Sequence, residues 1–222
     1  MGAELNLIQN LHKSTQRNYL ERMLDNKIEC MLTARKFDQE YWDGNRRYGF
    51  GGYRFIPGRW TQMAKDIVQK YNLTNQSSLL DIGCGKAFLL YEIQQLLPNL
   101  RIVGLDISKY AIENAHSALN ADLRVKDCRE PLVDFTDKSF DLVISINTLH
   151  NFDLPSVVSA LSEIQRIGKR SYIVVEAYES LEQFFNLQCW ALTAPTLITP
   201  KEWSWLFDLA NFRGDYEYIY FD

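Results

Sequence analysis

A glycine-rich turn follows a short apolar run that ends in an acidic residue, and this arrangement can bind a cofactor. The stretch LDIGCGKA, residues 80–87, contains Asp81 and then Gly83 and Gly85. Glycine lets the backbone bend sharply and lets bare N–H groups approach a ligand, and the helix expected after the turn adds its positive end. With a carboxylate beside it, the turn predicts a site for a nucleotide-like cofactor.

Two common cofactor motifs do not fit this turn. A dinucleotide site needs glycine or alanine three residues beyond Gly85, where the bulky Phe88 stands instead. A phosphate-binding P-loop needs Ser or Thr after its lysine, but Lys86 is followed by Ala87. The sequence therefore favours neither a nicotinamide dinucleotide nor a nucleoside triphosphate.

Polar residues also stand at the ends of the next three predicted strands, near residues 106, 127 and 147. These residues are Asp106 with its neighbour Ile107, Asp127 with Cys128, and Asn147. Because parallel strands present their carboxyl ends at one edge of a sheet, we expect these side chains to lie together in a crevice. Asp141 stands at the start of its strand, at the opposite edge, so we expect a structural role for it.

In order and spacing, the four segments resemble class I S-adenosylmethionine-dependent methyltransferases over roughly residues 60 to 177. The resemblance implies an α/β fold with a doubly wound, mostly parallel, Rossmann-like sheet of seven strands and an antiparallel C-terminal strand. It also implies S-adenosylmethionine as the cofactor. The implied cofactor-binding residues, from the methionine end to the adenine end, are Asp81, Gly83, Gly85, Ala87, Asp106, Ile107, Asp127, Cys128 and Asn147.

Within this resemblance, Ala87 replaces the last glycine of the motif, Asp106 binds the ribose hydroxyls, Asp127 faces the adenine amino group, and Asn147 lies at the cleft edge. Each residue also has a structural alternative. The glycines could simply bend the chain, Asp106 could cap the next helix, and Asp127 could be an ordinary turn residue. The agreement of all four segments favours the cofactor site.

Composition agrees with one compact domain. The chain has 222 residues, of which 46% are hydrophobic and 13% aromatic, and its formal net charge of −4 argues against DNA or another nucleic acid as the partner. No apolar stretch is long enough to span a membrane, and no secretory signal is expected. The four cysteines are scattered and there are three histidines, so we expect a reduced, metal-free, cytoplasmic protein.

Alternating helices and strands are expected from residue 60 onward. A helix should begin near Pro155 and end at Gly168, and another should begin with the capping box of Thr199 and Glu202. An edge strand is expected over 214–221. We therefore predict a methyltransferase core over residues 60–222 and, over residues 1–59, two helices between about 5 and 38 and a lid.

The predicted lid is the stretch 41–60, which holds seven aromatic residues, four arginines and five glycines. Glycines permit tight turns, aromatic rings supply flat faces, and arginines bind carboxylate or phosphate. We expect it to close over the cofactor and help to bind the acceptor; the alternative is an aromatic plug for the core. The candidate residues are Arg47, Tyr48, Tyr53, Arg59 and Trp60.

Methyl transfer demands few catalytic groups, because the sulfonium already carries an activated methyl group. His150, three residues after Asn147, is the candidate general base, and Glu176 and Tyr178 are further candidates at the end of the fifth strand. In the alternative, His150 only packs beside the cofactor.

We therefore predict a methyltransferase that acts on a small or medium polar acceptor, a metabolite or sugar-like molecule. The alternatives are a macromolecular methyltransferase for protein or RNA and a non-catalytic protein that binds S-adenosylmethionine. Trp203 and Trp205 are candidates for a homodimer contact or for the wall of the acceptor pocket.

Overall fold

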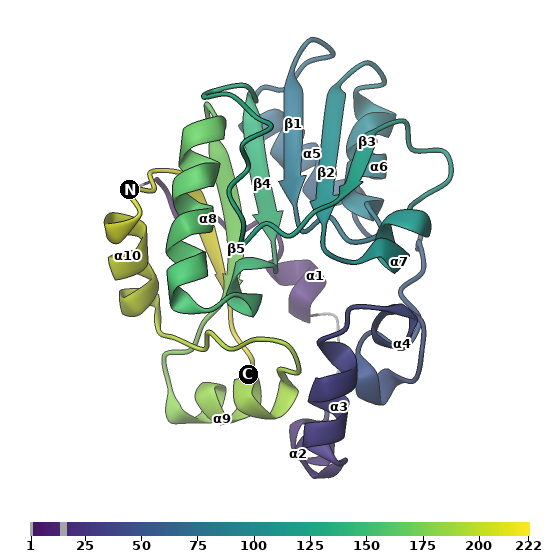
Figure 1. Ribbon diagram of the computed structural model, residues 1–222, viewed down its shortest axis with the longest axis vertical. Helices are drawn as coiled ribbons and strands as arrows, with labels where there is room; N and C mark the ends of the chain where they lie inside the picture. The colour runs from purple at the N-terminus through teal and green to yellow at the C-terminus, as the bar shows by residue number, and fades with distance from the viewer. Residues whose placement is uncertain (1, 14–16) are drawn as a thin grey trace.

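A parallel sheet lies between two layers of helices, with a helical cap beyond the carboxyl ends of its strands (Figure 1). The computed structural model describes residues 2–13 and 17–222. The strands of this part lie in the order β3-β2-β1-β4-β5-β6. They are β1 (Ser78–Ile82), β2 (Arg101–Asp106), β3 (Asp122–Val125), β4 (Leu142–Ile146), β5 (Ser171–Glu176) and β6 (Asp215–Ile219).

The helices divide into those of the core and those of the cap. The core helices are α5 (Thr61–Lys70), α6 (Phe88–Leu96), α7 (Lys109–Glu113), α8 (Leu154–Ile167) and α10 (Pro200–Leu209), with the short 3-10 helix η2 (Leu149–Asn151). The cap elements are α1 (Gln9–Lys13), α2 (Tyr19–Leu24), α3 (Lys27–Ala34), α4 (Gln39–Trp42), η1 (Arg46–Tyr48) and α9 (Leu181–Trp190). No helix in the described residues is long and apolar enough to cross a membrane.

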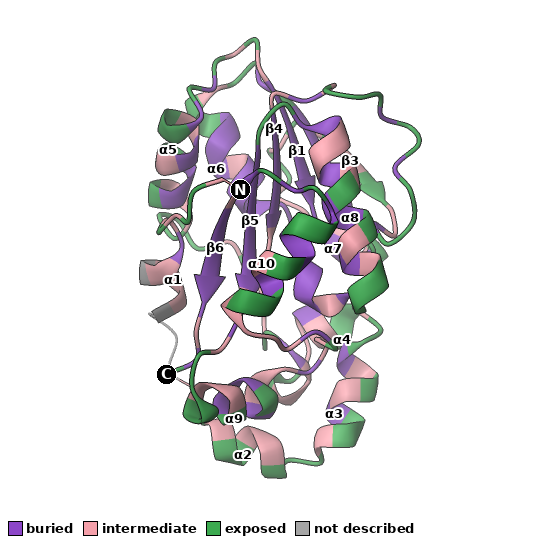
Figure 2. Cartoon of the chain, turned by 90° about the vertical axis from the view of Figure 1, so that its left-hand side faces the viewer, coloured by how far each residue is buried: buried purple, intermediate pink, exposed green. Residues whose placement is uncertain are grey.

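The strands direct their side chains to two cores, one on each face of the sheet. Leu80 of β1 pairs with Val103 of β2 and Val143 of β4, and all three lie in the core beneath α8 and α10. Leu79 pairs with Ile102, and both lie in the core beneath α5 and α6. Burial on both faces explains why the central strands are almost continuously apolar (Figure 2).

Two core helices begin at the signals predicted from the sequence. The Asp153 side chain accepts a hydrogen bond from the Ser156 N–H at 3.0 Å, which starts α8, and Gly168 ends it. Thr199 and Glu202 form a complete capping box at the start of α10. Both predicted helices are therefore confirmed.

The prediction for the end of the sheet is wrong in two respects. Strand β6 pairs with β5 in parallel rather than antiparallel, and the described residues form six strands rather than seven. The connection from β5 to β6 contains the helices α9 and α10. A helical crossover of this kind returns the chain to the edge from which it started, so the next strand runs parallel.

The N-terminal region has shorter helices than the two predicted between residues 5 and 38. Helices α1, α2 and α3 all end by Ala34, and residues 14–16 of the predicted segment lie outside the described residues. Helix α2 packs against α9, so the cap combines N-terminal and C-terminal segments (Figure 1).

Trp203 does not form surface, contrary to the prediction. Its side chain is fully buried, and its indole N–H donates to the carbonyl of Glu176 at 2.9 Å. It lies on the inner face of α10, whereas Trp205 is 62% exposed. Trp203 is therefore neither a dimer contact nor part of the main cavity described below.

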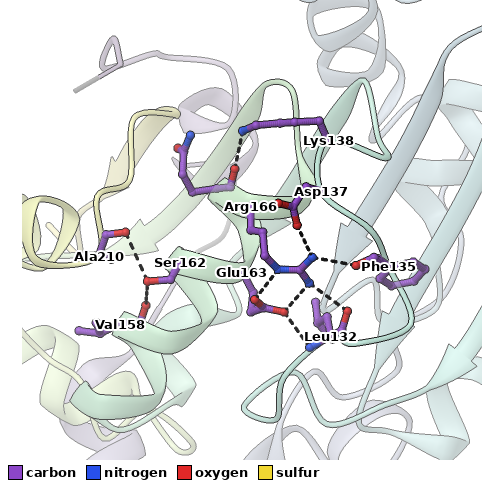
Figure 3. Close-up of polar contacts among 10 residues, drawn as sticks. Leu132, Phe135, Asp137, Lys138, Val158, Ser162, Glu163, Arg166 and Ala210 are labelled. Atoms are coloured by element: carbon purple, nitrogen blue, oxygen red, sulfur yellow. Dashed lines mark hydrogen bonds and ion pairs between the residues drawn. The ribbon is translucent and has the colours of Figure 1, made fainter.

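Arg166 of α8 forms hydrogen bonds and an ion pair with the loop that follows β3 (Figure 3). Its guanidinium donates to the carbonyls of Phe135 at 2.8 Å and Leu132 at 3.2 Å, and it pairs with Glu163 at 2.8 Å and Asp137 at 2.9 Å. These carboxylates raise the pKa of Arg166. The contacts hold the loop over the core on the α8 side of the sheet.

Candidate active site

A cavity of about 800 Å³ lies at the carboxyl ends of the strands, between the sheet and the cap. It brings together residues that are far apart in the sequence. Of the predicted site residues, those that line it are Asp81, Gly83, Gly85, Asp106, Ile107, Asp127, Cys128, Asn147, His150, Glu176, Tyr53, Arg59 and Trp60. Ala87 lies behind this wall, where its left-handed φ of +56° connects the glycine turn to α6.

The glycine turn requires both of its glycines. Gly83 and Gly85 have φ values of +83° and +55°, a region that side chains rarely adopt. A Cβ on Gly83 would collide with the Thr148 side chain, and one on Gly85 would lie 2.8 Å from the Trp42 ring. The turn is therefore packed tightly between the loop after β4 and the cap.

Asp106 holds the turn from the end of β2. One carboxylate oxygen accepts the Gly85 N–H and the other accepts the Ser108 N–H, each at 2.8 Å. Burial raises the pKa of Asp106, and the two N–H donors lower it in part. Each oxygen retains a second lone pair, so the carboxylate can still accept hydroxyl groups from a ligand in the cavity.

Asp81 is the least satisfied carboxyl group of the cavity wall. Its side chain is 4% exposed, and its Oδ1 atom has no hydrogen-bond partner among the described residues. Burial, with a further contribution from Asp106, raises the pKa of Asp81 to about 8. A buried carboxyl without a partner is unfavourable, and a cationic group in the cavity would relieve this.

Asp127 and Cys128 lie beside each other on the wall but differ in chemistry. Asp127 accepts the Arg129 N–H at 3.0 Å and pairs with the Arg129 guanidinium at 2.6 Å, which lowers the pKa of this carboxyl. Burial raises the pKa of the Cys128 thiol to about 12, so it is an unreactive apolar surface. Among the described residues, no three His, Cys, Asp or Glu side chains gather to hold a metal ion.

His150 and Glu176 face each other across the cavity wall, with Nε2 and Oε2 3.7 Å apart. This distance exceeds a hydrogen bond, and His150 Nδ1 has no partner among the described residues. Burial lowers the pKa of His150 more than Glu176 raises it, so the imidazole is neutral near pH 7 and able to accept a proton. Tyr178 is not among the residues that line the cavity, and its ring packs 4.5 Å from that of Phe184.

Residues 73–211 match the sequence profile of a family described as a methyltransferase domain. This chain belongs to the methyltransferase domain family. The match spans more than half of the chain and agrees with the parallel sheet and the position of the cavity. Together with the relatives described next, it confirms the predicted class I family and its cofactor, S-adenosylmethionine.

Individual relatives support the same family and fold. An uncharacterized methyltransferase of Schizosaccharomyces pombe is 34% identical over 122 residues, which is 52% of this chain and 45% of that protein. A methyltransferase from Archaeoglobus fulgidus has a TM-score of 0.54 at 23% identity over 69% of each chain. The plantazolicin methyltransferase BpumL, solved with S-adenosylhomocysteine, has a TM-score of 0.55 at 19% identity over 82% of this chain and 76% of its own. The chain spans less than half of the S. pombe relative.

Aromatic side chains form the part of the methyltransferase cap that touches the glycine turn. The Trp42 and Phe50 rings stack with centroids 5.2 Å apart, and Tyr53 stacks on Phe88 at 5.2 Å. The Trp42 indole N–H donates to Ser108 Oγ at 2.9 Å, next to Asp106. The predicted lid is thus in contact with the glycine turn, and its aromatic residues pack among themselves as well.

Arg47 and Tyr48 do not line the cavity, although the sequence predicted both as lid residues. Arg47 pairs with Asp25 at 2.8 Å, and the Tyr48 hydroxyl donates to Glu29 at 2.9 Å. Both residues lie in the 3-10 helix η1, whose tight winding directs them toward α2 and α3. Their neighbour Arg46 lines the cavity instead.

Asp43 connects the cap to the core. It pairs with Lys86 Nζ at 2.6 Å, accepts the Tyr110 hydroxyl at 2.8 Å and accepts the Tyr53 N–H at 3.0 Å. The hydrogen bonds from Lys86 and Tyr110 lower the pKa of Asp43 against the effect of its burial. The lysine of the glycine turn therefore holds the cap rather than a phosphate.

The residues at the cap end of the cavity were not among the predicted site residues, although Arg46 belongs to the predicted lid. Arg22 of α2, Arg46 of η1 and Trp190 of α9 line it there. All three lie in cap elements, and Trp190 is at the end of a helix whose position was not predicted. Their approach depends on the packing of α2 against α9.

Proposed function

We propose that this chain transfers the methyl group of S-adenosylmethionine to a small or medium polar acceptor, a metabolite or sugar-like molecule. The observation that carries the proposal is the cavity that joins the glycine turn and acidic strand ends to the cap. In this proposal residues 60–222 form the cofactor-binding core, and residues 1–59 form the cap and lid over the acceptor. A concave cavity of about 800 Å³ has the size of a small-molecule site, which favours a small acceptor over a folded macromolecule.

The residues of the sheet wall fit the groups of S-adenosylmethionine. The unpartnered Asp81 carboxyl suits the ammonium of the methionine end, beside the backbone of Gly83 and Gly85. The free lone pairs of Asp106 suit the ribose hydroxyls, and Asp127 suits the adenine amino group. Ile107, Cys128 and Asn147 complete the wall, while Ala87 supports the turn from behind.

S-adenosylmethionine supplies an activated methyl group, so the protein has to position the acceptor, exclude water and remove a proton where the acceptor carries one. We assign proton removal to His150, which lines the cavity and whose buried imidazole is neutral near pH 7. Glu176, 3.7 Å from Nε2, stabilises the imidazolium that forms. The position of Tyr178 outside the cavity gives no support to a catalytic role for it.

Calorimetric titration with S-adenosylhomocysteine, S-adenosylmethionine and NAD tests the cofactor assignment. We expect both sulfur nucleosides to bind and NAD not to bind. Tight NAD binding without a response to either nucleoside would overturn the proposal. Screening for release of S-adenosylhomocysteine with pools of polar metabolites then tests turnover; binding without turnover across the screen would favour the non-catalytic alternative.

The four cysteines carry free thiols, which supports our proposal that the protein acts in the reducing cytoplasm. A homodimer stays a prediction. Leu24, Ile28 and Leu32 of the cap are exposed apolar side chains that could serve as the contact in place of Trp203. The mass of the protein in solution tests this.

A further inference from the structure

Three guanidinium groups converge on one indole ring at the cap end of the cavity. The central guanidinium carbons of Arg22, Arg46 and Arg17 lie 4.6, 5.0 and 5.4 Å from the centroid of the Trp190 ring. They come from α2, from η1 and from the residue before Asn18, and all four side chains line the cavity. The site is thus built from several segments around one flat aromatic floor.

Arg22 and Arg46 differ from those arginines of the molecule that form ion pairs. Arg47, Arg124 and Arg166 each lie within 3 Å of a carboxylate oxygen. No ion pair in the described part of the chain includes Arg22 or Arg46. Arg22 instead donates to the carbonyl of Arg46 at 2.7 Å, and its buried Nε atom has no hydrogen-bond partner among the described residues. Both guanidinium groups therefore retain donors for a ligand.

The positively charged guanidinium groups of this cluster repel one another. Burial, with a smaller effect of Arg46, lowers the pKa of Arg22 to about 10. Burial and Arg17 lower the pKa of Arg46 in the same way. Asp25 is the carboxylate with an electrostatic effect on Arg22, and it is already paired with Arg47. An anion bound among the arginines would remove this repulsion.

Charge is also divided between the two ends of the cavity. The sheet end carries Asp81, Asp106 and Asp127, which suit the positively charged cofactor, whereas the cap end carries the arginine cluster. His150 and Glu176 line the same cavity, so an acceptor held at the cap end can present an atom to them. The cluster is therefore placed to bind the acceptor rather than the cofactor.

We propose that Arg22 and Arg46, packed on Trp190 with Arg17 beside them, bind a phosphate group of the methyl acceptor. A phosphate monoester carries up to two negative charges and three acceptor oxygens, which match several converging guanidinium groups better than a single carboxylate does. The acceptor is thus a phosphorylated small molecule, with the atom to be methylated on the side of His150. This inference rests on the proposed function and names its substrate class.

Inorganic phosphate tests the site without knowledge of the acceptor. In the full-length protein with S-adenosylhomocysteine present, phosphate binding is measured by calorimetry at constant ionic strength, with acetate as the comparison. We expect saturable phosphate binding and at least tenfold weaker acetate binding, a difference of about 1.4 kcal/mol. Acetate binding as tight as phosphate would indicate a carboxylate acceptor and overturn the proposal, as would phosphate binding that does not saturate.

Neighbouring arginines supply matched variants. Arg22→Gln and Arg46→Gln should each weaken phosphate binding about tenfold, whereas Arg47→Gln, whose side chain pairs with Asp25 outside the cavity, should leave it unchanged. All three should bind S-adenosylhomocysteine as the wild type does. Equal phosphate affinity in the Arg46→Gln and Arg47→Gln proteins would refute the site. If the wild-type protein does not bind S-adenosylhomocysteine at all, the proposed function is refuted instead.

Discussion

The raised pKa of Asp81 predicts that cofactor binding depends on pH. The carboxyl has a pKa of about 8 in the free protein because it is buried and lies near Asp106. An ammonium group bound to it favours the ionised form and lowers this pKa, so binding releases a proton. Affinity for S-adenosylhomocysteine should therefore rise with pH up to about 8 and fall as the solution becomes more acidic.

The size of the effect follows from the ionised fraction of Asp81. For a pKa of about 8, roughly 0.3% of the carboxyl is ionised at pH 5.5 and roughly 9% at pH 7.0. Affinity should therefore increase by about 30-fold over this interval, or about 2 kcal/mol. The interval lies below the range in which an α-amino group of a ligand loses its own proton.

Calorimetry at pH 5.5, 6.25 and 7.0, in two buffers of different ionisation enthalpy, measures both the affinity and the proton released. Methylthioadenosine, which lacks the ammonium, should bind without this slope, and the comparison cancels any effect of His150 on both ligands. Asp81→Asn should remove the slope and bind S-adenosylhomocysteine about as weakly at every pH as the wild type does at pH 5.5. A constant wild-type affinity with no proton release would refute the role of Asp81 in binding the ammonium.

Three other substitutions separate cofactor binding, proton removal and stability. Asp106→Ala should weaken S-adenosylhomocysteine binding by about 2 to 4 kcal/mol, because two charge-assisted bonds to the ribose hydroxyls are lost together with the bond that holds Gly85. Calorimetry measures this affinity, and an unchanged value would contradict the assignment. His150→Gln should lower kcat about 100-fold and leave the cofactor affinity unchanged. Steady-state rates with an identified acceptor measure kcat, and titration measures the affinity. An unchanged kcat would mean that His150 only packs beside the cofactor. Arg166→Ala should lower the free energy of unfolding by about 2 kcal/mol, because two loop carbonyls lose their donor; urea unfolding should detect this while cofactor affinity stays unchanged.

The sheet wall of the site was predictable because it depends on a regular geometry. Parallel strands end at one edge, so Asp81, Asp106, Asp127 and Asn147 meet there wherever the helices between them begin and end. The parallel direction of β6 was also encoded, in the crossover helices that precede it. The resemblance to the methyltransferase family implied an antiparallel last strand, and for β6 this prediction is wrong.

The lid residues were less predictable, because irregular backbone has no fixed period. The 3-10 helix η1 is a single turn of three residues, and the sequence has no repeating apolar pattern there that would indicate which residue faces the core. Within η1, Arg46 lines the cavity and Arg47 pairs with Asp25, although the two are adjacent and chemically identical. Composition alone indicated arginines in the lid but could not identify the one that faces the cavity.

Net charge was a poor guide to the ligand for a related reason. The total of −4 is a sum over the whole surface, whereas a ligand responds to the few charges that line its own end of the cavity. Acidic residues at the strand ends and arginines on Trp190 give that cavity two ends of opposite sign. A cationic cofactor would neutralise the acidic strand ends, and an anionic acceptor would neutralise the arginines on Trp190. Binding of both ligands would therefore remove the like-charge repulsion that is present at each end of the unliganded cavity.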